Sequence, residues 1–504
     1  MYNNAFNSNP AAHPRKQPEY KCLPGSAALK EIFSRCGDYQ SREIMFGLEG
    51  EIPLRVCWLD GVVSGTAVAE EVIRPLTQLS RSRSVQTEQQ CLELIMLGAA
   101  YSYSAKQRQT MDELVSDLTH GHCAVILDGI NQAVCFEVRS SNVRGISEPT
   151  LEKSLKGAKD SFAETLRINT GLVRRRICSP QLKLVESTVG RKSRTQVAIM
   201  FMDNIADPST VEELARRLDA LDVDALLATG TLEEYIVDSP RSPLPQLLHT
   251  ERPDRFAMQL MSGRVGLLVD GLPIGLVLPA SLADFMRVTG DSSKNYLVAT
   301  ALTCLRYLSL FVAVFLPALY VAVAMYHQEM IPTRLLLSII DAKQHVPFST
   351  ALEIISMLVA FELLQEAGLR LPNPIGDTVS IIGALIVGQS AVEARVISPI
   401  AIIVVATSGI ACYTLPSQDL GAVIRLLRMA LVVAAALAGL FGVGIVLCLF
   451  LIHLSGIDSF GLSYTAPLTD GRPFPLFRLL IQLPKSMDKY RDANLNTPDK
   501  RRQK

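Results

Sequence analysis

The strongest constraint on this chain is the position of its membrane-length apolar segments, which all lie in the last 200 residues, after about 295 water-compatible residues. Tyr307–His327 is an uncharged run of 21 residues. It is long enough to cross a hydrocarbon core of about 30 Å at about 1.5 Å per residue. Met429–Leu454 is a second such run, without formal charge unless His453 is protonated. A soluble part ahead of a helical membrane part favours a receptor, channel or transporter subunit over a soluble enzyme.

Composition restricts the compartment and the partners. The 49 basic and 49 acidic residues balance, so net charge gives no reason to expect nucleic acid. The ten cysteines are scattered without a C-x-x-C pair, which argues against a zinc site or a disulfide framework and fits a reducing cytosol. Residues 1–21 are polar and rich in proline, without the apolar core of a signal peptide. We therefore expect the soluble part to stay in the cytoplasm.

The soluble part contains a repeated pattern. Four short apolar runs end in an acidic turn, at Asp60, Asp128, Asp203 and Asp270. Asp60 and Asp128 are 68 residues apart, and Asp203 and Asp270 are 67 residues apart. A strand-turn-helix pattern surrounds Asp60 and Asp203, whereas the sequences around Asp128 and Asp270 are typical of β-hairpins. Equal spacing indicates a duplicated unit. The predicted fold class is an α/β cytosolic region of two similar, duplicated subdomains, followed by an all-α helical transmembrane domain.

The expected domain boundaries follow from these patterns. They are a polar N-terminal tail without fixed structure (1–40), α/β subdomain 1 (41–147), a helical linker (148–184), α/β subdomain 2 (185–294), a helical transmembrane domain (295–465) and a basic cytosolic C-terminal tail (466–504).

Several residues in the soluble part allow both a functional and a structural interpretation. The four aspartates fit turn chemistry better than a metal or phosphoryl site, because they occupy equivalent turn positions instead of converging. The basic run Arg174–Arg176 fits a solvated helix end, or a contact with anionic lipid or phosphate. His120 and His122 lack a third metal ligand nearby. We predict no catalytic, cofactor-binding or metal-binding residues, and the sequence contains none of the common catalytic or nucleotide-binding motifs.

Features of the sequence give conflicting indications of the topology of the membrane part. Five apolar segments are present: 307–327, about 346–364, 377–391, 398–415 and 429–454. The third is short and rich in glycine, so it is marginal for a full crossing. The basic tail after Lys485 favours a cytoplasmic C-terminus, and we therefore expect an even number of crossings, four. Arg425 and Arg428 would then lie on the outer side, unless residues 418–428 form an amphipathic helix at the membrane surface.

The second apolar segment is the candidate functional segment. Ser349, Glu353, Ser356 and Ala360 recur at helical spacing on one face. A carboxylate in an apolar span costs roughly 2.5–3.5 kcal/mol, so it normally faces protein or water. In a symmetric oligomer these residues would line a pore, with an acidic ring at Glu353. The alternative is a buried, paired or protonated carboxylate that holds helices together, with Arg306 or Arg334 as its partner.

Secondary membrane candidates are Gln389, Glu393 and Arg306. The glycines at positions 439, 442 and 444 indicate close helix packing more than a binding site.

Several stretches resemble a known family. They are residues 242–271, with the element TERPDR (250–255), residues 348–402, with GQSAVEARVISP (388–399), and residues 425–464, with a weaker match at 148–177. Together they cover about residues 50 to 480 and resemble the A subunit of the GerA-type spore germination receptors. Arg395, where family members usually carry a small residue, and the first 45 residues depart from the family pattern.

The resemblance implies more than the residue patterns do. Family A subunits resemble an oligomeric, pentameric ion-conducting component of a nutrient receptor in the spore inner membrane. The implied partners are membrane lipid, further copies of the chain, a transporter-like B subunit that binds the nutrient and a lipoprotein C subunit. Alternatives are a non-conducting scaffold of the germination machinery, such as an A-like paralogue linked to dipicolinic acid release, and a secondary transporter. The transporter is disfavoured because the membrane part shows no internal repeat.

Overall fold

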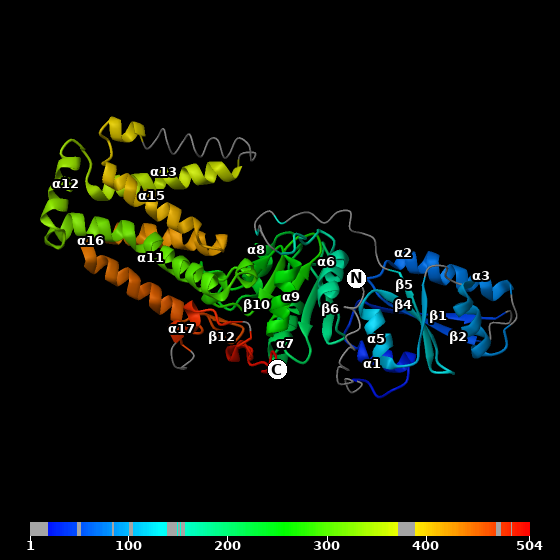
Figure 1. Ribbon diagram of the computed structural model, residues 1–504. Coiled ribbons are helices and arrows are strands. Elements are labelled where there is room, and N and C mark those ends of the chain that lie inside the picture. Colours follow the sequence, from blue (N-terminus) through cyan, green and yellow to red (C-terminus); the bar gives the residue numbers. More distant parts are fainter. Residues whose placement is uncertain are drawn as a thin grey trace, which may run out of the picture.

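The computed structural model describes residues 19–47, 52–82, 85–99, 104–138, 149, 152, 157–370, 389–469, 475–484 and 486–503. These residues form three successive parts along an elongated molecule: subdomain 1, subdomain 2 and a helical region (Figure 1). The predicted coarse division into α/β parts followed by helices is confirmed.

Subdomain 1 is an antiparallel sheet covered by helices on both faces. Its described strands lie in the order β1-β2-β4-β5-β3. All six residues of β4 are buried, since apolar clusters fill both faces of the sheet. Its elements are α1 (Ser26–Ile32), β1 (Tyr39–Phe46), β2 (Ile52–Leu59), α2 (Gly65–Ala67), η1 (Val68–Ile73), α3 (Arg74–Ser82), α4 (Glu88–Leu94), η2 (Ile95–Ala99), β3 (Ala105–Arg108), α5 (Met111–Thr119), β4 (His122–Leu127) and β5 (Gln132–Glu137).

Subdomain 2 has the same arrangement. Its described strands lie in the order β6-β7-β9-β10-β8, which is the order of subdomain 1 when each sheet is numbered from its own first strand. Its elements are α6 (Leu166–Arg176), β6 (Leu182–Val189), β7 (Thr195–Met202), α7 (Pro208–Asp219), α8 (Thr229–Ile236), β8 (Leu248–Thr250), α9 (Pro253–Ser262), β9 (Val265–Val269), β10 (Gly275–Leu278), α10 (Leu282–Phe285) and η3 (Thr289–Ser293).

The hairpin aspartates make equivalent contacts in the two subdomains. Asp128, in the turn between β4 and β5, accepts a hydrogen bond from the backbone N–H of Ser26 at 2.7 Å, at the first residue of α1. Asp270, in the turn between β9 and β10, accepts one from the N–H of Leu166 at 2.9 Å, at the first residue of α6. In each case the carboxylate satisfies an N–H group that has no partner within its helix.

The subdomains are joined by a buried ion pair and by close backbone contact. Arg174 of α6 donates to both carboxylate oxygens of Asp38, at 2.7 and 2.8 Å, and both side chains are almost fully buried. A Cβ on Gly171 would lie 2.3 Å from the carbonyl oxygen of Gly61, so both positions need glycine. The first residue of the basic run is therefore not a solvated helix end, and Arg176 also pairs within the chain, with Asp160.

Three expected boundaries differ from the structure. The range assigned to a tail (1–40) contains α1, where Leu29 is fully buried. Within the range assigned to a helical linker (148–184), residues 157–165 contain no regular helix, whereas α6 packs against subdomain 2 and also contacts subdomain 1 through Gly171 and Arg174. The C-terminal range 466–504 packs back on subdomain 2: Arg491 donates to the carbonyl oxygen of Met261 at 3.2 Å.

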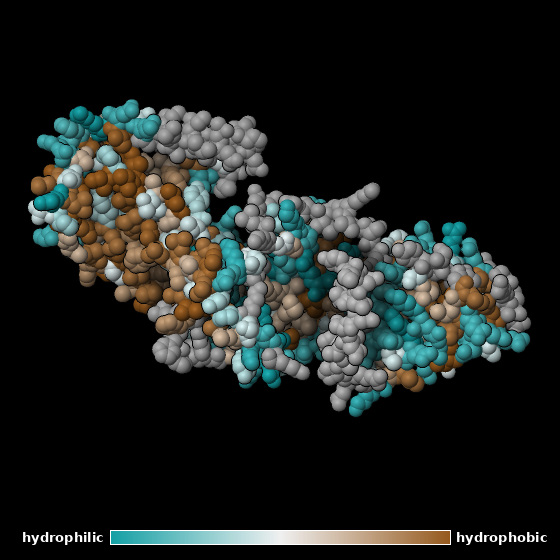
Figure 2. All heavy atoms as spheres, viewed as in Figure 1, coloured by the Kyte–Doolittle hydropathy of each residue, from teal (hydrophilic) through white to brown (hydrophobic). Residues whose placement is uncertain are grey.

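The helical region is apolar at its surface. Its described helices are α11 (Tyr296–Tyr326), η4 (Gln328–Met330), α12 (Thr333–Lys343), α13 (Thr350–Arg370), α15 (Pro399–Tyr413) and α16 (Gln418–Ser455), followed by β11 (Asp458–Ser459), β12 (Leu462–Ser463), α17 (Pro475–Leu480) and η5 (Ala493–Leu495). Hydrophobic side chains gather over this region in Figure 2, whereas hydrophilic ones are frequent over the subdomains. Among the described helices, α11 and α16 are long and apolar enough to cross a membrane, and α15 is a shorter apolar helix. Most of the third apolar segment (377–388) lies outside the described residues.

Helix α16 is broken and turns back on itself. Ala438 and Gly439 have non-helical backbone angles, and Gly439 has φ +58° and ψ −141°. A Cβ on Gly442 would lie 2.2 Å from the carbonyl oxygen of Ala434, which is incompatible with a straight helix. The second arm runs from the far end of the helical region back to β12 (Figure 1). The expected surface helix at 418–428 is therefore the start of the first arm, and residues 429–454 are not one straight span.

Candidate functional site within the helices and at their junction with subdomain 2

The candidate carboxylate Glu353 lies inside the helical region. Its side chain is 0% exposed, and its Oε1 lies 3.2 Å from Nζ of Lys343 in α12. Its Oε2 accepts a hydrogen bond at 3.1 Å from the backbone N–H of Ser398, which is the N-cap of α15. An anion is favoured at this position, because the first N–H groups of a helix lack partners within the helix. Glu353, in α13, thus connects α13 to α12 and α15 through these two contacts.

The four predicted pore residues do not share one environment. Ser349 and Ser356 are exposed and Ala360 is half-buried, whereas Glu353 points into the protein. Within this chain, Glu353 is therefore a buried, paired carboxylate, as in the alternative to the pore interpretation. The expected partners were wrong: Lys343 pairs with Glu353, and Arg306 pairs with Asp291 at 2.5 and 2.9 Å.

The remaining membrane candidates lie elsewhere. Gln389 and Glu393 are exposed at the start of the described segment that leads to α15. Arg306 joins α11 to the end of subdomain 2, because its partner Asp291 lies in η3 and is 3% exposed. These candidates do not meet Glu353 in one site.

A second buried charge cluster was missed by the sequence interpretation. Arg428, 2% exposed, donates to Glu362 at 3.0 Å and to the hydroxyl of Ser408 at 3.1 Å, while its Nε has no hydrogen-bond partner. Arg425 contacts the other oxygen of Glu362 at 3.1 Å. Two guanidinium groups therefore share one carboxylate between α13, α15 and α16. In the sequence, Arg425 and Arg428 conflict with the expected topology, but their spacing does not identify Glu362 as their partner.

Both ends of α16 contact subdomain 2. At its start, Asp419 lies 3.0 Å from Nδ1 of His249, whose Nε2 lies 3.3 Å from Glu233. At its end, His453 Nε2 lies 2.9 Å from the hydroxyl of Ser242. Burial lowers the pKa of His249, but its hydrogen bond to Asp419 and the negative charges of Asp419 and Glu233 outweigh burial and raise the pKa to about 9. His249 is therefore protonated at neutral pH.

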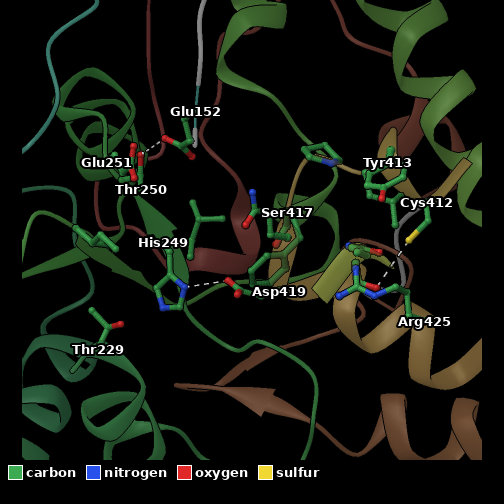
Figure 3. A pocket seen from close by; sticks show the side chains of 18 of the residues that line it. Glu152, Thr229, His249, Thr250, Glu251, Cys412, Tyr413, Ser417, Asp419 and Arg425 are labelled. Atoms are coloured by element: carbon green, nitrogen blue, oxygen red, sulfur yellow. Dashed lines mark hydrogen bonds and ion pairs between the residues drawn. The ribbon is translucent and has the colours of Figure 1, made fainter. Parts of the chain in front are cut away.

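A cavity of about 820 Å³ lies between subdomain 2 and the helices. Subdomain 2 contributes Glu233 and His249 to its wall, and the helices contribute Asp419, Arg425 and Arg428. In Figure 3, His249 and Asp419 lie on one side of the cavity, and Arg425 lies on the other, beside Cys412 and Tyr413. The cavity walls therefore carry charges of both signs.

The other sequence candidates occupy separate places. The four repeated aspartates do not meet in one site. Asp60 and Asp270 contact the start of α6, at Arg167 (3.1 Å) and Leu166, whereas Asp128 contacts Ser26 and Asp203 lies 3.9 Å from Arg35. His122 is buried, and its Nδ1 contacts the carbonyl oxygen of Asp117 at 3.1 Å. Within the described part of the chain, no three His, Cys, Asp or Glu side chains are placed to hold a metal ion.

Removing the partner of Glu353 should destabilise the helical region. We expect Lys343→Met to lower the apparent Tm of the full chain in detergent, since breaking a buried ion pair costs about 3–5 kcal/mol when one charge stays buried. Adding Glu353→Gln should recover part of the loss, because the amide oxygen can still accept from Ser398. Arg334→Met, at an exposed position of α12, is the matched control. An unchanged Tm for Lys343→Met would contradict this role.

The junction at His249 should depend on pH. The folded-state pKa lies above the ordinary value of 6.5, so the stabilisation is complete below about pH 6.5 and is lost as the pH rises through about 9. We expect His249→Gln to lower the apparent Tm of the full chain at pH 6, by at most about 3 kcal/mol in stability. At pH 10, the variant and the wild type should have the same apparent Tm. An equal gap at both pH values would exclude a protonated His249 as the cause.

Comparisons with known proteins identify the family. The family profile described as Bacillus/Clostridium GerA spore germination protein matches residues 27–494. Spore germination protein KA of Bacillus subtilis (strain 168) is 34% identical over 478 residues, which cover 95% of this chain and 87% of the relative. Spore germination protein GerLA of Bacillus cereus is 33% identical over 475 residues, with coverage of 94% and 95%.

Two further similarities concern a protein without a described function and a solved structure. The uncharacterized membrane protein YfkQ of Bacillus subtilis (strain 168) is 34% identical over 434 residues, which cover 86% of this chain and 83% of that protein. The crystal structure of the N-terminal domain of the A subunit of the Bacillus megaterium spore germinant receptor GerK3 is 28% identical, with a TM-score of 0.41, and the match covers 51% of this chain and 96% of that chain. Because the profile and the relatives span nearly the whole sequence, this chain belongs to the GerA family of spore germination proteins.

Proposed function

We propose that this chain is the A subunit of a nutrient receptor in the spore inner membrane, and that several copies form a cation channel whose opening starts germination. The observation that carries the proposal is the similarity to spore germination proteins across both the soluble and the helical parts. The proposal has no catalytic step. Nutrient binding is assigned to a transporter-like B subunit, and a lipoprotein C subunit completes the receptor.

The face proposed for the pore is the exposed side of α13. Ser349, Leu352, Ser356, Val359 and Leu363 are exposed and recur at spacings of three and four residues, so they share one side of the helix. Hydroxyl groups on an otherwise apolar face suit a narrow, water-containing passage between identical subunits. A closed ring, for which we propose five copies, would place one such face per subunit around the axis. The buried carboxylate behind this face would position α13.

We propose that subdomains 1 and 2 lie in the cytoplasm, which is the spore core, and that the chain is a multi-pass membrane protein. The C-terminal segment packs on subdomain 2, so both lie on one side and the number of crossings is even. Both ends of α16 contact subdomain 2, so the last apolar stretch adds an even number of crossings, whereas the expected total of four counted it as one. Arg425 and Arg428 line the cavity beside subdomain 2, in agreement with the excess of basic residues on cytoplasmic sides.

We also propose that subdomains 1 and 2 arose by duplication. The nearly equal spacing of the acidic turns, the shared strand order and the equivalent helix contacts of Asp128 and Asp270 support this origin. Each shared feature sits at the corresponding place in both units.

The alternative is a non-conducting scaffold that couples germination proteins. The pairing of Glu353 with Lys343 favours it, because a carboxylate neutralised inside each subunit cannot form the acidic ring that would attract cations. The two functions differ in whether the exposed face of α13 contacts permeating ions.

Potassium release distinguishes the two functions. In cells or spores that carry the B and C partners, a nutrient panel should trigger potassium release with wild type. With Ser356→Lys, release should fall at least tenfold at matched protein levels, since a ring of like charges repels cations. Ser338→Lys, at an exposed position of α12, is the control and should retain release. Normal release from the assembled Ser356→Lys protein would remove this face from the pore and favour the scaffold.

A further inference from the structure

The cavity between subdomain 2 and the helices has opposite residual charges on its two sides. On one side, protonated His249 lies between the carboxylates of Glu233 and Asp419, which leaves one negative charge in this group. On the other side, Arg425 and Arg428 share Glu362, which leaves one positive charge. Glu362 does not line the cavity, whereas both arginines do. The cavity wall on this side therefore carries the two arginines and not their carboxylate.

The remaining charged groups of the cavity wall do not neutralise the negative charge on one side or the positive charge on the other. Arg255 pairs with Glu152, whose other oxygen accepts from the hydroxyl of Thr250 at 2.6 Å, so this pair is neutral. Glu251 adds a carboxylate on the subdomain 2 side and takes part in an interaction of its own. Glu366, one turn beyond Glu362 on α13, does not line the cavity.

Arg428 supplies an independent sign of a missing partner. Its side chain is 98% buried and its Nε is an unsatisfied donor, which is unfavourable in the protein interior. Guanidinium groups bind phosphate and carboxylate with several hydrogen bonds at once. An anionic group in the cavity would add a second counter-charge to the two arginines.

The spacing of the charges limits the size of the ligand. Asp419 and Arg425 are six residues apart on α16, which corresponds to about 9 Å along the helix axis. A small molecule with an anionic group and an ammonium group a few ångströms apart would reach both. A simple anion would satisfy only the arginine side.

We propose that this cavity binds a small zwitterion, with its phosphate or carboxylate on Arg425 and Arg428 and its ammonium group on Glu233 and Asp419. The ligand comes either from the headgroup of an aminophospholipid or from a free solute of the same chemistry. The cavity touches both the soluble part and the apolar helices, so occupancy would stiffen the junction between them. The site is independent of whether the chain conducts ions.

The test measures binding of glycerophosphoethanolamine to the purified full chain in detergent, with inorganic phosphate and ethanolamine as separate probes. Wild type should bind the zwitterion at least tenfold more tightly than either single-charge probe. Arg425→Gln and Glu233→Gln should each weaken this binding at least tenfold. Each variant leaves one neutral ion pair in place, so folding should survive, and the apparent Tm checks this. Arg216→Gln, on the exposed face of α7, is the matched control and should bind as wild type.

Mass spectrometry of co-purified lipid identifies the source. Enrichment of phosphatidylethanolamine over phosphatidylglycerol in wild type, lost in Arg425→Gln, supports the headgroup. Binding of the soluble zwitterion without such enrichment supports a free solute. Absence of zwitterion binding, or phosphate binding that is as tight and unaffected by Glu233→Gln, would overturn the proposal.

Discussion

The turn at Ala438 and Gly439 is the constraint on which the helical region depends. The backbone angles of Gly439 lie in a region open to glycine alone, and a Cβ there would approach Tyr326 and His327 at 3.0 Å. The hydroxyl of Tyr326 donates to the carbonyl oxygens of Ala436 and Leu437, at 2.7 and 3.2 Å, directly before the break in the helix. The turn lets both ends of α16 reach subdomain 2.

Buried charges then fix how the helices meet. Glu353 needs Lys343 and the N-terminus of α15, and Arg428 needs Glu362 on α13, because an unpaired charge in this apolar region is expensive. Each cluster joins three helices. The second cluster also faces the cavity, so the interactions that hold the helices together also set the charge of the cavity wall. Packing and the proposed ligand site are therefore coupled.

Much of the soluble fold could be predicted, because its signals are local. The strand and turn patterns around Asp60, Asp128, Asp203 and Asp270 predicted the two hairpins and the two strand-turn-helix units where they occur. The partner of Glu353 could not be predicted, since it depends on how α12 folds back against α13. The turn in α16 was missed because Gly439 lies in an unbroken apolar run, where composition does not distinguish one long helix from two short arms.

A cysteine cross-link tests most directly whether α16 returns to subdomain 2. A straight helix of 38 residues would be about 57 Å long, so its two ends could not both contact one subdomain. Ser242→Cys and His453→Cys, in a chain without its exposed native cysteines, should be joined within one chain in membranes by a short bifunctional thiol reagent, because the two native side chains meet at 2.9 Å. Cysteines at His249 and Asp419 are the positive control for the start of the helix. If the control pair is cross-linked but positions 242 and 453 are not, the second arm of α16 does not return to subdomain 2.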